Sequence, residues 1–321
     1  MSTAPAALRT RWGGQRALAV LSIVLANVLG GVSYPAQKAA LAGLPPATVT
    51  LLRNVVALVA LAGCVRMRRV APVAWTRAES LRVVVLGAFA FALPMWLGIV
   101  GVERASASNA SILILLEPVT IVAIAWLVLG ERIGALKLAS LSLGLFGALA
   151  IVLEGSSLGD LMAGEHFTGN ALLALHGILW GCYTPLAKPL CERHDPFDLC
   201  LRATAVGVVA LIPAALAEAG RIETGPALAP ALAWTVALGL AVSFGGTLLW
   251  LAALRHIPAT NVAGFVFLQP LAGVLVGIGL LGERLSGAAL VGAALIVAGV
   301  GFDVALSSAR KDSDQSADGF T

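Results

Sequence analysis

Glu117 stands in the middle of an apolar stretch that runs from Ser108 to Gly130, and Pro118 follows it directly. Insertion scales put the cost of an acidic side chain in hydrocarbon at ~2.5–3.5 kcal/mol, so this carboxyl group needs a proton, a buried partner or nearby water. Pro118 removes one backbone donor, which would leave the carbonyl of Ile114 without its usual helical partner. The carboxyl group is therefore suited to bind a freed backbone group, a ligand or a proton.

Gln269 and Pro270 form a second such pair in a later apolar stretch, and Pro270 frees the carbonyl of Val266 in the same way. In a structural interpretation, protonated Glu117 and neutral Gln269 hydrogen-bond these freed groups and hold their two helices together. In a functional interpretation, Glu117 contacts a substrate or carries a proton, and Gln269 lines the same site. Glutamine makes the hydrogen bond without titrating, so the sequence leaves both interpretations open. Pro118 and Pro270 are candidate helix breaks.

Aromatic and polar residues share one helical face where His176, Trp180 and Tyr183 are spaced i, i+4, i+7. Asn27 and Tyr34 form a matching face on the first apolar stretch. An ionisable residue inside a membrane usually faces the protein interior, so we expect both faces to line a central cavity. Packing between neighbouring helices is the alternative, and an interfacial aromatic belt could hold the two tyrosines.

Two tryptophans follow flexible elements of the chain. Trp96 comes after Pro94, and Trp250 comes after Gly245 and Gly246. We expect the tryptophans to form a wall or gate for a partly apolar substrate. The alternative is that they face lipid or pack between helices.

Ser243 and Thr247 lie one helical turn apart and can offer hydroxyl groups to a ligand or bond back to their own helix. Lys38 and Lys188 end their helices, where a long basic side chain either reaches water or takes part in anion binding or gating. Arg53 lies near the start of a helix and has the same alternatives.

Composition places these residues in a membrane. The 321 residues are 59% hydrophobic and 12% charged, against ~25% charged in soluble domains. A spanning helix needs ~20 apolar residues. The candidate stretches are 17–38, 47–65, 80–101, 108–130, 135–153, 170–191, 199–217, 232–254, 260–281 and 286–305. We therefore predict an all-α membrane protein with ten transmembrane helices.

Most Lys and Arg residues lie on alternate connections, and the positive-inside rule then puts both termini in the cytoplasm. The net charge of +4 follows from this topology, and we expect no nucleic-acid partner. We predict a multi-pass protein of the cytoplasmic (inner) membrane of a bacterium. It would have a cytoplasmic N-terminal segment at 1–16, an external linker at 154–169 and a disordered cytoplasmic tail at 306–321.

The chain repeats itself. From Ser108 it has SNASILILLEPVTIVAIAWLVLGERI, which matches TNVAGFVFLQPLAGVLVGIGLLGERL from Thr260 at an offset of 152 residues. Earlier in each half, GGVSYPAQK (Gly30–Lys38) matches WGCYTPLAK (Trp180–Lys188) at an offset of 150. Several matches in the same order at nearly one offset indicate an internal duplication.

The duplication divides the chain into two halves, 17–153 and 170–305, with five predicted helices each. Because five is odd, the second half must enter the membrane in the opposite sense. Inverted-topology repeats of this kind recur in secondary transporters, whose substrate sites lie near the bilayer midplane between the repeats.

These motifs carry a resemblance to a known family. The W-G-x-x-x-P-x-x-K stretch near the start of each half, and the [EQ]-P…LGER helix toward its end, resemble the EamA-type family of the drug/metabolite transporter superfamily. The first copy departs from the pattern at Gly30, where the second has Trp180, and the second copy has Gln269-Pro270 in place of Glu-Pro. The resemblance implies a central cavity between the halves and movement of small metabolites such as amino acids.

We therefore predict a secondary transporter that moves a small organic metabolite, an amino acid or similar, by alternating access, and we favour export. The alternative is a translocator of a lipid or lipid-linked sugar. An intramembrane enzyme is a distant alternative, because the chain has no HExxH motif and no cluster of His and Asp at ligand spacing. We expect no metal or cofactor and four free cysteines; protons are a candidate coupling partner. The small residues spaced four apart in 135–153 and 286–305 fit a monomer or a homodimer.

Overall fold

The computed structural model describes residues 6–68, 73–105, 113–153, 167–222, 224–281 and 287–317. Within these ranges every regular element is helical, as the composition predicts. Among the described residues, seven stretches are long and apolar enough to cross a membrane: Gly14–Leu41, Pro46–Arg68, Arg77–Arg104, Ala135–Val152, Pro196–Arg221, Leu228–Leu254 and Gly287–Ala305. Leu116–Leu129 is a shorter apolar helix.

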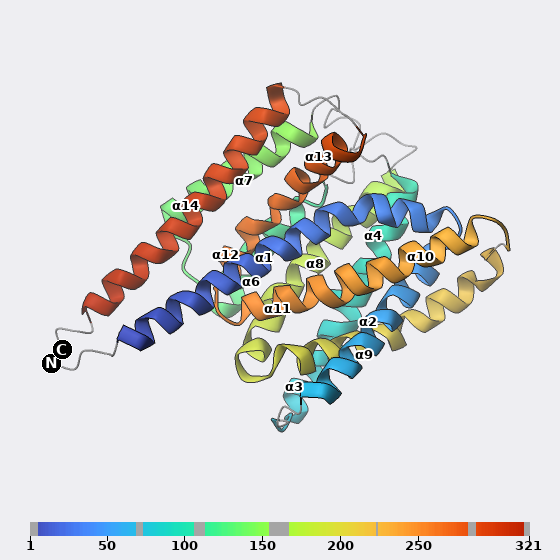
Figure 1. The fold of residues 1–321 in the computed structure, drawn as a ribbon, viewed down its shortest axis with the longest axis horizontal. Helices are drawn as coiled ribbons and strands as arrows, with labels where there is room; N and C mark the ends of the chain where they lie inside the picture. Colours follow the sequence, from blue (N-terminus) through green and yellow to red (C-terminus); the bar gives the residue numbers. More distant parts are fainter. Residues whose placement is uncertain are drawn as a thin grey trace.

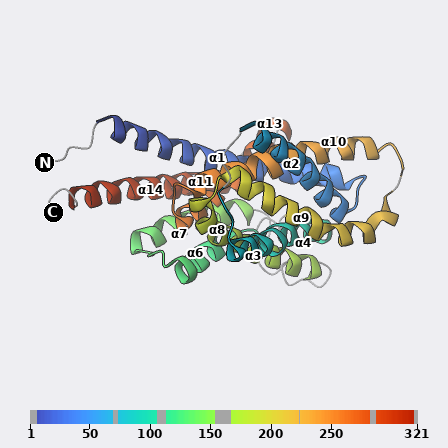
Figure 2. The ribbon, with the colours of Figure 1, turned by 90° about the horizontal axis from the view of Figure 1, so that it is seen from below.

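The two halves have the same order of elements. The first contains α1 (Ala6–Leu41), α2 (Pro46–Arg68), α3 (Arg77–Val85), η1 (Leu86–Ala92), α4 (Leu93–Arg104), α6 (Leu116–Leu129) and α7 (Ala135–Val152). The second contains α8 (Phe167–Arg193), α9 (Pro196–Glu218), η3 (Ala219–Arg221), α10 (Leu228–Leu238), η4 (Gly239–Gly246), α11 (Thr247–Leu254), α12 (Ala259–Val266), α13 (Leu268–Leu281) and α14 (Gly287–Ala317). Helices from the two halves lie side by side, α7 with α14 and α2 with α9 (Figure 1). The start of α1 and the end of α14 lie at the same end of the molecule (Figure 2).

Two predicted helices are broken at equivalent places. The helix at 260–281 is interrupted at Phe267 between α12 and α13, and the stretch at 108–130 is interrupted at Leu115, just before α6. The two residues have nearly equal backbone angles, φ −67° and ψ −8° at Leu115 against φ −62° and ψ −13° at Phe267. Breaks at corresponding positions of two repeats are a feature of transporter substrate sites.

This break corrects the expectation for Ile114. Because α6 begins at Leu116, Pro118 lies in the first helical turn, where a missing N–H costs no intrahelical bond. The carbonyl of Ile114 accepts a hydrogen bond from the backbone N–H of Glu117 at 3.0 Å. The carbonyl of Ile114 therefore lacks its usual helical partner at residue 118, as predicted, but it is bonded to Glu117 and is not left free.

A second irregularity also occurs once in each half. Both η1 and η4 are π-helical segments that interrupt an otherwise α-helical span. In the first half the π-helical segment ends just before Pro94, and in the second half it includes Gly245 and Gly246. These are the residues that the sequence predicts to be flexible. Such π-helical segments inside α-helices often lie at functional sites.

Glycines bring backbones of the two halves into close contact, and the contacts occur in exchanged pairs. A Cβ at Gly31 would collide with the carbonyl oxygen of Gln269, and a Cβ at Gly181 would lie 2.8 Å from that of Glu117. Each residue of one pair is the repeat counterpart of a residue in the other. The duplicated sequence therefore makes the same α1–α13 contact a second time between α8 and α6.

Two further exchanged pairs extend this interface. A Cβ at Gly87 would lie 2.5 Å from the carbonyl oxygen of Ala203, and one at Gly239 would lie 2.8 Å from that of Arg53. Between α7 and α14, Gly147 faces the carbonyl of Gly292, and Gly299 faces that of Ser140. Small residues are the usual means of close helix contact in membranes, because lipid leaves little hydrophobic force to drive helices together.

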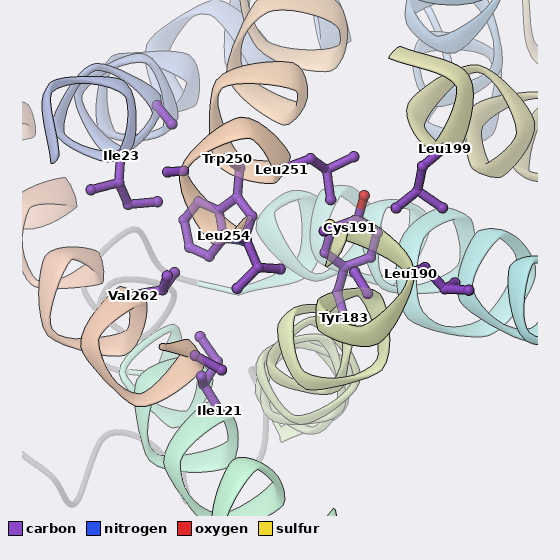
Figure 3. Packing of buried hydrophobic residues seen from close by; sticks show 14 of the residues in the cluster. Ile23, Ile121, Tyr183, Leu190, Cys191, Leu199, Trp250, Leu251, Leu254 and Val262 are labelled. Carbon is purple, nitrogen blue, oxygen red and sulfur yellow. The ribbon is translucent and has the colours of Figure 1, made fainter. Parts of the chain in front are cut away.

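An apolar core fills the end of the bundle nearer the chain termini. Ile23 of α1, Ile121 of α6, Leu199 of α9 and Leu254 of α11 are fully buried there (Figure 3). This core joins elements of both halves, because α1 and α6 precede the linker while α9 and α11 follow it. Side chains from both repeats therefore pack together at this end.

The polar C-terminal stretch departs from its prediction. We predict disorder from residue 306, but α14 continues to Ala317. Propagation adds one hydrogen bond for each residue fixed, so an established apolar helix extends into the polar residues that follow it. The predicted linker at 154–169 lies outside the described residues up to 166, and α8 begins at Phe167.

Replacing Gly147 by alanine should introduce a steric clash that pushes α7 away from α14. Its Cβ would lie 2.6 Å from the carbonyl oxygen of Gly292, and overpacking of this kind costs about 1–3 kcal/mol. Thermal unfolding of the detergent-purified protein should show a lowered midpoint. Gly63→Ala in α2 is the matched control, because a Cβ there has nothing within 4 Å. An unchanged midpoint for Gly147→Ala would contradict the close contact.

Candidate functional site

A cavity of about 130 Å³ lies between the two halves. Its walls come from α1, α2, α4, α8, η4 and α11, and from the positions that flank the break before α6 and after α12. Nine of the predicted residues line it: Tyr34, Glu117, His176, Trp180, Tyr183, Gly246, Thr247, Trp250 and Gln269. The other predicted residues lie outside its lining: Asn27, Trp96, Ser243, Pro94, Gly245, Pro118, Pro270, Lys38 and Lys188.

One wall is aromatic. The rings of His176 and Trp180 are stacked with centroids 6.1 Å apart, and those of Trp180 and Tyr183 are stacked at 5.8 Å. Phe91 of η1 extends this stack from the side, 5.9 Å from Trp180. The spacing along α8 predicts this shared face, and π-helical η1 brings the fourth ring to it. Such a wall offers flat, polarizable surface to an apolar group.

The imidazole of His176 has a defined orientation. Its Nδ1 lies 2.7 Å from the carbonyl oxygen of Pro94. A carbonyl can only accept a hydrogen bond, so Nδ1 carries the proton and a neutral ring keeps Nε2 as an acceptor. Gly98 makes room for the ring, because a Cβ there would lie 2.7 Å from Nδ1.

Glu117 and Gln269 occupy equivalent places but have different partners. Gln269 donates from Nε2 to Oδ1 of Asn27 at 3.1 Å, and Asn27 donates from Nδ2 to the carbonyl of Ile23 at 2.8 Å. Gln269 thus bonds to α1. Glu117 is 1% exposed, and its Oε1 has no hydrogen-bond partner within the described ranges. It is the second residue of α6, at a helix N-terminus that favours negative charge.

The two tryptophans have different surroundings. Trp250 lines the cavity and donates from Nε1 to Oγ1 of Thr184 at 2.9 Å. Trp96 packs against a separate apolar cluster that includes Ala40 and Leu238. Within the described part of the chain, its buried Nε1 has no hydrogen-bond partner. The repeat alignment offers no way to tell these two positions apart.

Sequence reasoning left open whether Arg53 reaches water or binds an anion, and it did not name Ser33 and Gln37, two further polar residues that line the cavity. Arg53 lines it, is 5% exposed, and donates from Nε to Oγ of Ser243 at 2.8 Å. Ser243 therefore bonds to another helix and supports a cavity residue from behind. Thr247 lines the cavity and bonds back to the carbonyl of Val242 at 3.5 Å. Arg53 corresponds to Ala203 in the second repeat, and that difference is the signal that could have found it.

The two lysines lie away from the cavity. Lys38 is exposed at the end of α1. Lys188 donates to the carbonyls of Leu254 and Ile257 at 2.8 and 3.1 Å, and it pairs with Glu192 at 3.1 Å. It therefore satisfies carbonyl groups at the C-terminal end of α11, where a cation also complements the helix dipole.

A network of charged and aromatic groups joins the two halves at the end of the bundle that lies away from the cavity. Trp75 stacks on His194 with centroids 3.6 Å apart and donates from Nε1 to Asp198 at 2.7 Å. Glu79 pairs with Arg193 at 2.9 Å. Because Trp75 and Glu79 belong to the first half and their partners to the second, the network holds the repeats together at this end.

A bundle of long apolar helices, duplicated and hollowed between its halves by a cavity of polar and aromatic side chains, defines a multi-pass membrane transporter. Comparison with known sequences agrees. The sequence model of the EamA-like transporter family matches residues 17–153 and 167–302, and the chain belongs to this family. The two matches overlap closely with the halves inferred from the repeated motifs, 17–153 and 170–305.

Individual relatives are also transporters by name. The chain is 31% identical over 270 residues to the "Probable terminal-alkyne amino-acid exporter" of Streptantibioticus cattleyicolor, covering 83% of this chain and 86% of the relative. It is 32% identical over 181 residues to an "Uncharacterized transporter" of Archaeoglobus fulgidus, covering 56% of this chain and 60% of the relative. A solved crystal structure shares the fold with a TM-score of 0.75 at 18% identity, covering 91% of this chain and 99% of the other.

Replacing Gly98 by alanine will push the imidazole of His176 off the carbonyl of Pro94 and lower the thermal unfolding midpoint, at a cost of about 1–3 kcal/mol. Gly246→Ala is the matched control on the same cavity, because its nearest atom would be 3.7 Å away. A double-mutant cycle with His176→Ala tests the cause, since removing the ring should remove most of the penalty. Equal penalties in both backgrounds would show that the clash lies elsewhere.

Proposed function

We propose that this protein is a secondary transporter that moves a small organic metabolite, an amino acid or similar, out of the cell by alternating access. The observation that carries the proposal is the cavity, which both repeats line and which holds buried polar groups inside an apolar bundle. A buried carboxyl and a buried guanidinium are costly in a membrane protein and usually mark a substrate or ion pathway.

The proposed architecture has ten spans in two inverted five-helix repeats. It is supported by helices in each of the ten predicted stretches, among them α8 and the broken pair α12 and α13. The start of α1 and the end of α14 lie together (Figures 1 and 2), as an even number of crossings requires. The exchanged glycine contacts support a pseudo-twofold relation between the halves.

Alternating access follows from this symmetry. The cavity lies toward the end of the bundle where α1 ends and α8 begins, and the apolar core of Figure 3 fills the other end. In an inverted pair, each half can adopt the conformation of the other, which would open the cavity at the opposite end. The distribution of Lys and Arg supports a cytoplasmic position for the filled end, so we propose that this state faces outward.

The size of the cavity favours a small metabolite over a lipid. A cavity of ~150 Å³ in another protein binds benzene, and this one measures about 130 Å³. The name of the exporter from Streptantibioticus cattleyicolor supports an amino-acid-like substrate and the outward direction.

Glu117 is the candidate proton carrier. Its carboxyl group lines the cavity, and the repeat counterpart Gln269 shows that the fold accepts an amide at this position. A proton gradient could thus be coupled to export if Glu117 binds and releases a proton as the cavity changes side.

Counterflow in reconstituted vesicles, with a panel of radiolabelled amino acids, tests transport directly. We expect the wild-type protein to exchange at least one compound and to drive its uphill movement when a pH gradient is imposed. Glu117→Gln should keep exchange and lose uphill movement, because the amide cannot carry a proton. Glu192→Gln, on the exposed end of α8, is the control and should change neither activity.

Two results would count against these proposals. Uphill movement that survives Glu117→Gln with unchanged pH dependence would remove Glu117 as the proton carrier. If folded wild-type protein exchanged no compound of a broad metabolite panel, the transport proposal itself would fail.

A further inference from the structure

Arg53 is a buried cation whose position needs a reason. It lies about 10 Å along α2 from the helix start at Pro46, at a rise of 1.5 Å per residue. It is 5% exposed and lines the cavity. Arginine keeps its charge in proteins, so deprotonation does not relieve the cost of burying it.

The protein supplies this guanidinium with a single neutral acceptor. Nε donates to Oγ of Ser243 at 2.8 Å, and no carboxylate in the described ranges lies within ion-pair distance of Arg53. Two other buried charges are paired, Lys137 with Asp303 and Glu79 with Arg193. Glu117, which also lines the cavity, is in no ion pair within the described ranges. The N–H groups of Nη1 and Nη2 have no hydrogen-bond partner in the described part of the chain. Arg53 also lines the cavity, so these donors are available to a ligand there.

The fold itself does not require the guanidinium. The contact of α2 with η4 is repeated by α9 with η1, where Ala203 takes the place of Arg53 and Phe91 takes the place of Ser243. Ala203 and Phe91 both belong to the apolar core. The same helix crossing therefore forms with apolar side chains in one half and with a guanidinium bonded to a neutral hydroxyl in the other, so Arg53 serves a purpose besides packing.

We propose that Arg53 receives the carboxylate of the transported substrate, and that the substrate is a small carboxylate with an apolar body. The proposal rests on the proposed transport function and assigns the ligand class of its cavity. A guanidinium presents parallel N–H donors that match the two oxygens of a carboxylate. Ser243 occupies Nε and leaves the terminal edge of the fork for the ligand.

The other residues that line the cavity indicate which ligand body and which net charge would fit. Trp180, Tyr183 and Trp250 offer apolar and aromatic surface for its body. The cavity also holds the carboxyl group of Glu117, so one cationic and one acidic residue face the same space. This balance suits a monocarboxylate or a zwitterionic amino acid and disfavours a dianion such as a phosphate ester, which one arginine beside an acid would leave partly unpaired.

The test compares ligands that differ only in the group that Arg53 would bind. Alanine, valine, leucine and phenylalanine are each used with the deaminated acid and the decarboxylated amine of the same skeleton. Binding to the full-length protein in detergent is measured by titration calorimetry. We expect wild-type protein to bind the amino acid and the acid of at least one skeleton, and to bind the matching amine roughly tenfold or more weakly, since hydrogen bonds to charged groups are the strong ones.

Variants on α2 separate charge from structure. Arg53→Gln should remove the preference for carboxylates, and Arg53→Lys should retain part of it, because lysine keeps the charge without the fork. Arg66→Gln in the last turn of the same helix is the control and should bind as wild type. Should Arg53→Gln unfold, Ser243→Ala keeps the guanidinium but loses its support, and carboxylate binding should weaken severalfold.

Failure of this inference and failure of the transport proposal give different results. Folded Arg53→Gln that binds carboxylates as wild type does, or wild-type protein that binds amines and no carboxylate, overturns the assignment of Arg53. Carboxylate binding that depends on Arg53 in a protein that exchanges no compound in vesicles supports the assignment and contradicts transport.

Discussion

The structure depends on the close approach of helix backbones at glycines between the two halves. Lipid is as apolar as the helices it surrounds, so no hydrophobic force selects one arrangement of helices over another. At Gly31 and Gly181, at Gly87 and Gly239, and between α7 and α14, the missing Cβ lets a glycine meet a carbonyl of the opposite half. Because each of these contacts has a counterpart with the halves exchanged, the same interface is used twice. The cavity is the space that these crossings enclose.

The packing contacts are repeated in the two halves, but several residues that line the cavity are not. Glu117 is matched by Gln269, Trp180 by Gly30 and Arg53 by Ala203, and at least one member of each pair lines the cavity. A duplicated sequence can keep its packing residues alike in both copies, because each makes the same contact. A substrate that is not itself symmetric needs different groups on its two sides. Positions where the copies differ are therefore the places to search for recognition in a protein built this way.

Much of the architecture could be predicted from the sequence, because its signals are local or repeated. Apolar runs gave the helices, and the matched motifs gave the duplication that the family comparison confirms. The spacing of His176, Trp180 and Tyr183 placed three rings on one face, and all three line the cavity. The polar end of α14 was missed, because composition does not reveal how far a helix propagates beyond its apolar part.

The rest of the site could not be predicted, because it depends on how helices are rotated and where they break. Arg53 lies at a depth that fits either a snorkelling side chain or a cavity residue; the difference from Ala203 marks the position, and the contact with Ser243 distinguishes the two. Trp96 and Trp250 look alike in sequence, yet only the latter lines the cavity. The breaks at Leu115 and Phe267 lie a few residues before the prolines that suggest them, which moves Glu117 to a helix N-terminus.

The inverted relation of the two halves is the central claim, and sidedness of two equivalent loops tests it most directly. A variant that lacks Cys64, Cys182, Cys191 and Cys200 receives a single cysteine, either at position 132 or at position 284. Intact cells that carry each variant are then treated with a membrane-impermeant thiol reagent. The account predicts labelling at 284 from outside, with 132 labelled only after the membrane is opened. Labelling of both positions from the same side would contradict an inverted repeat and the exchange of conformations built on it.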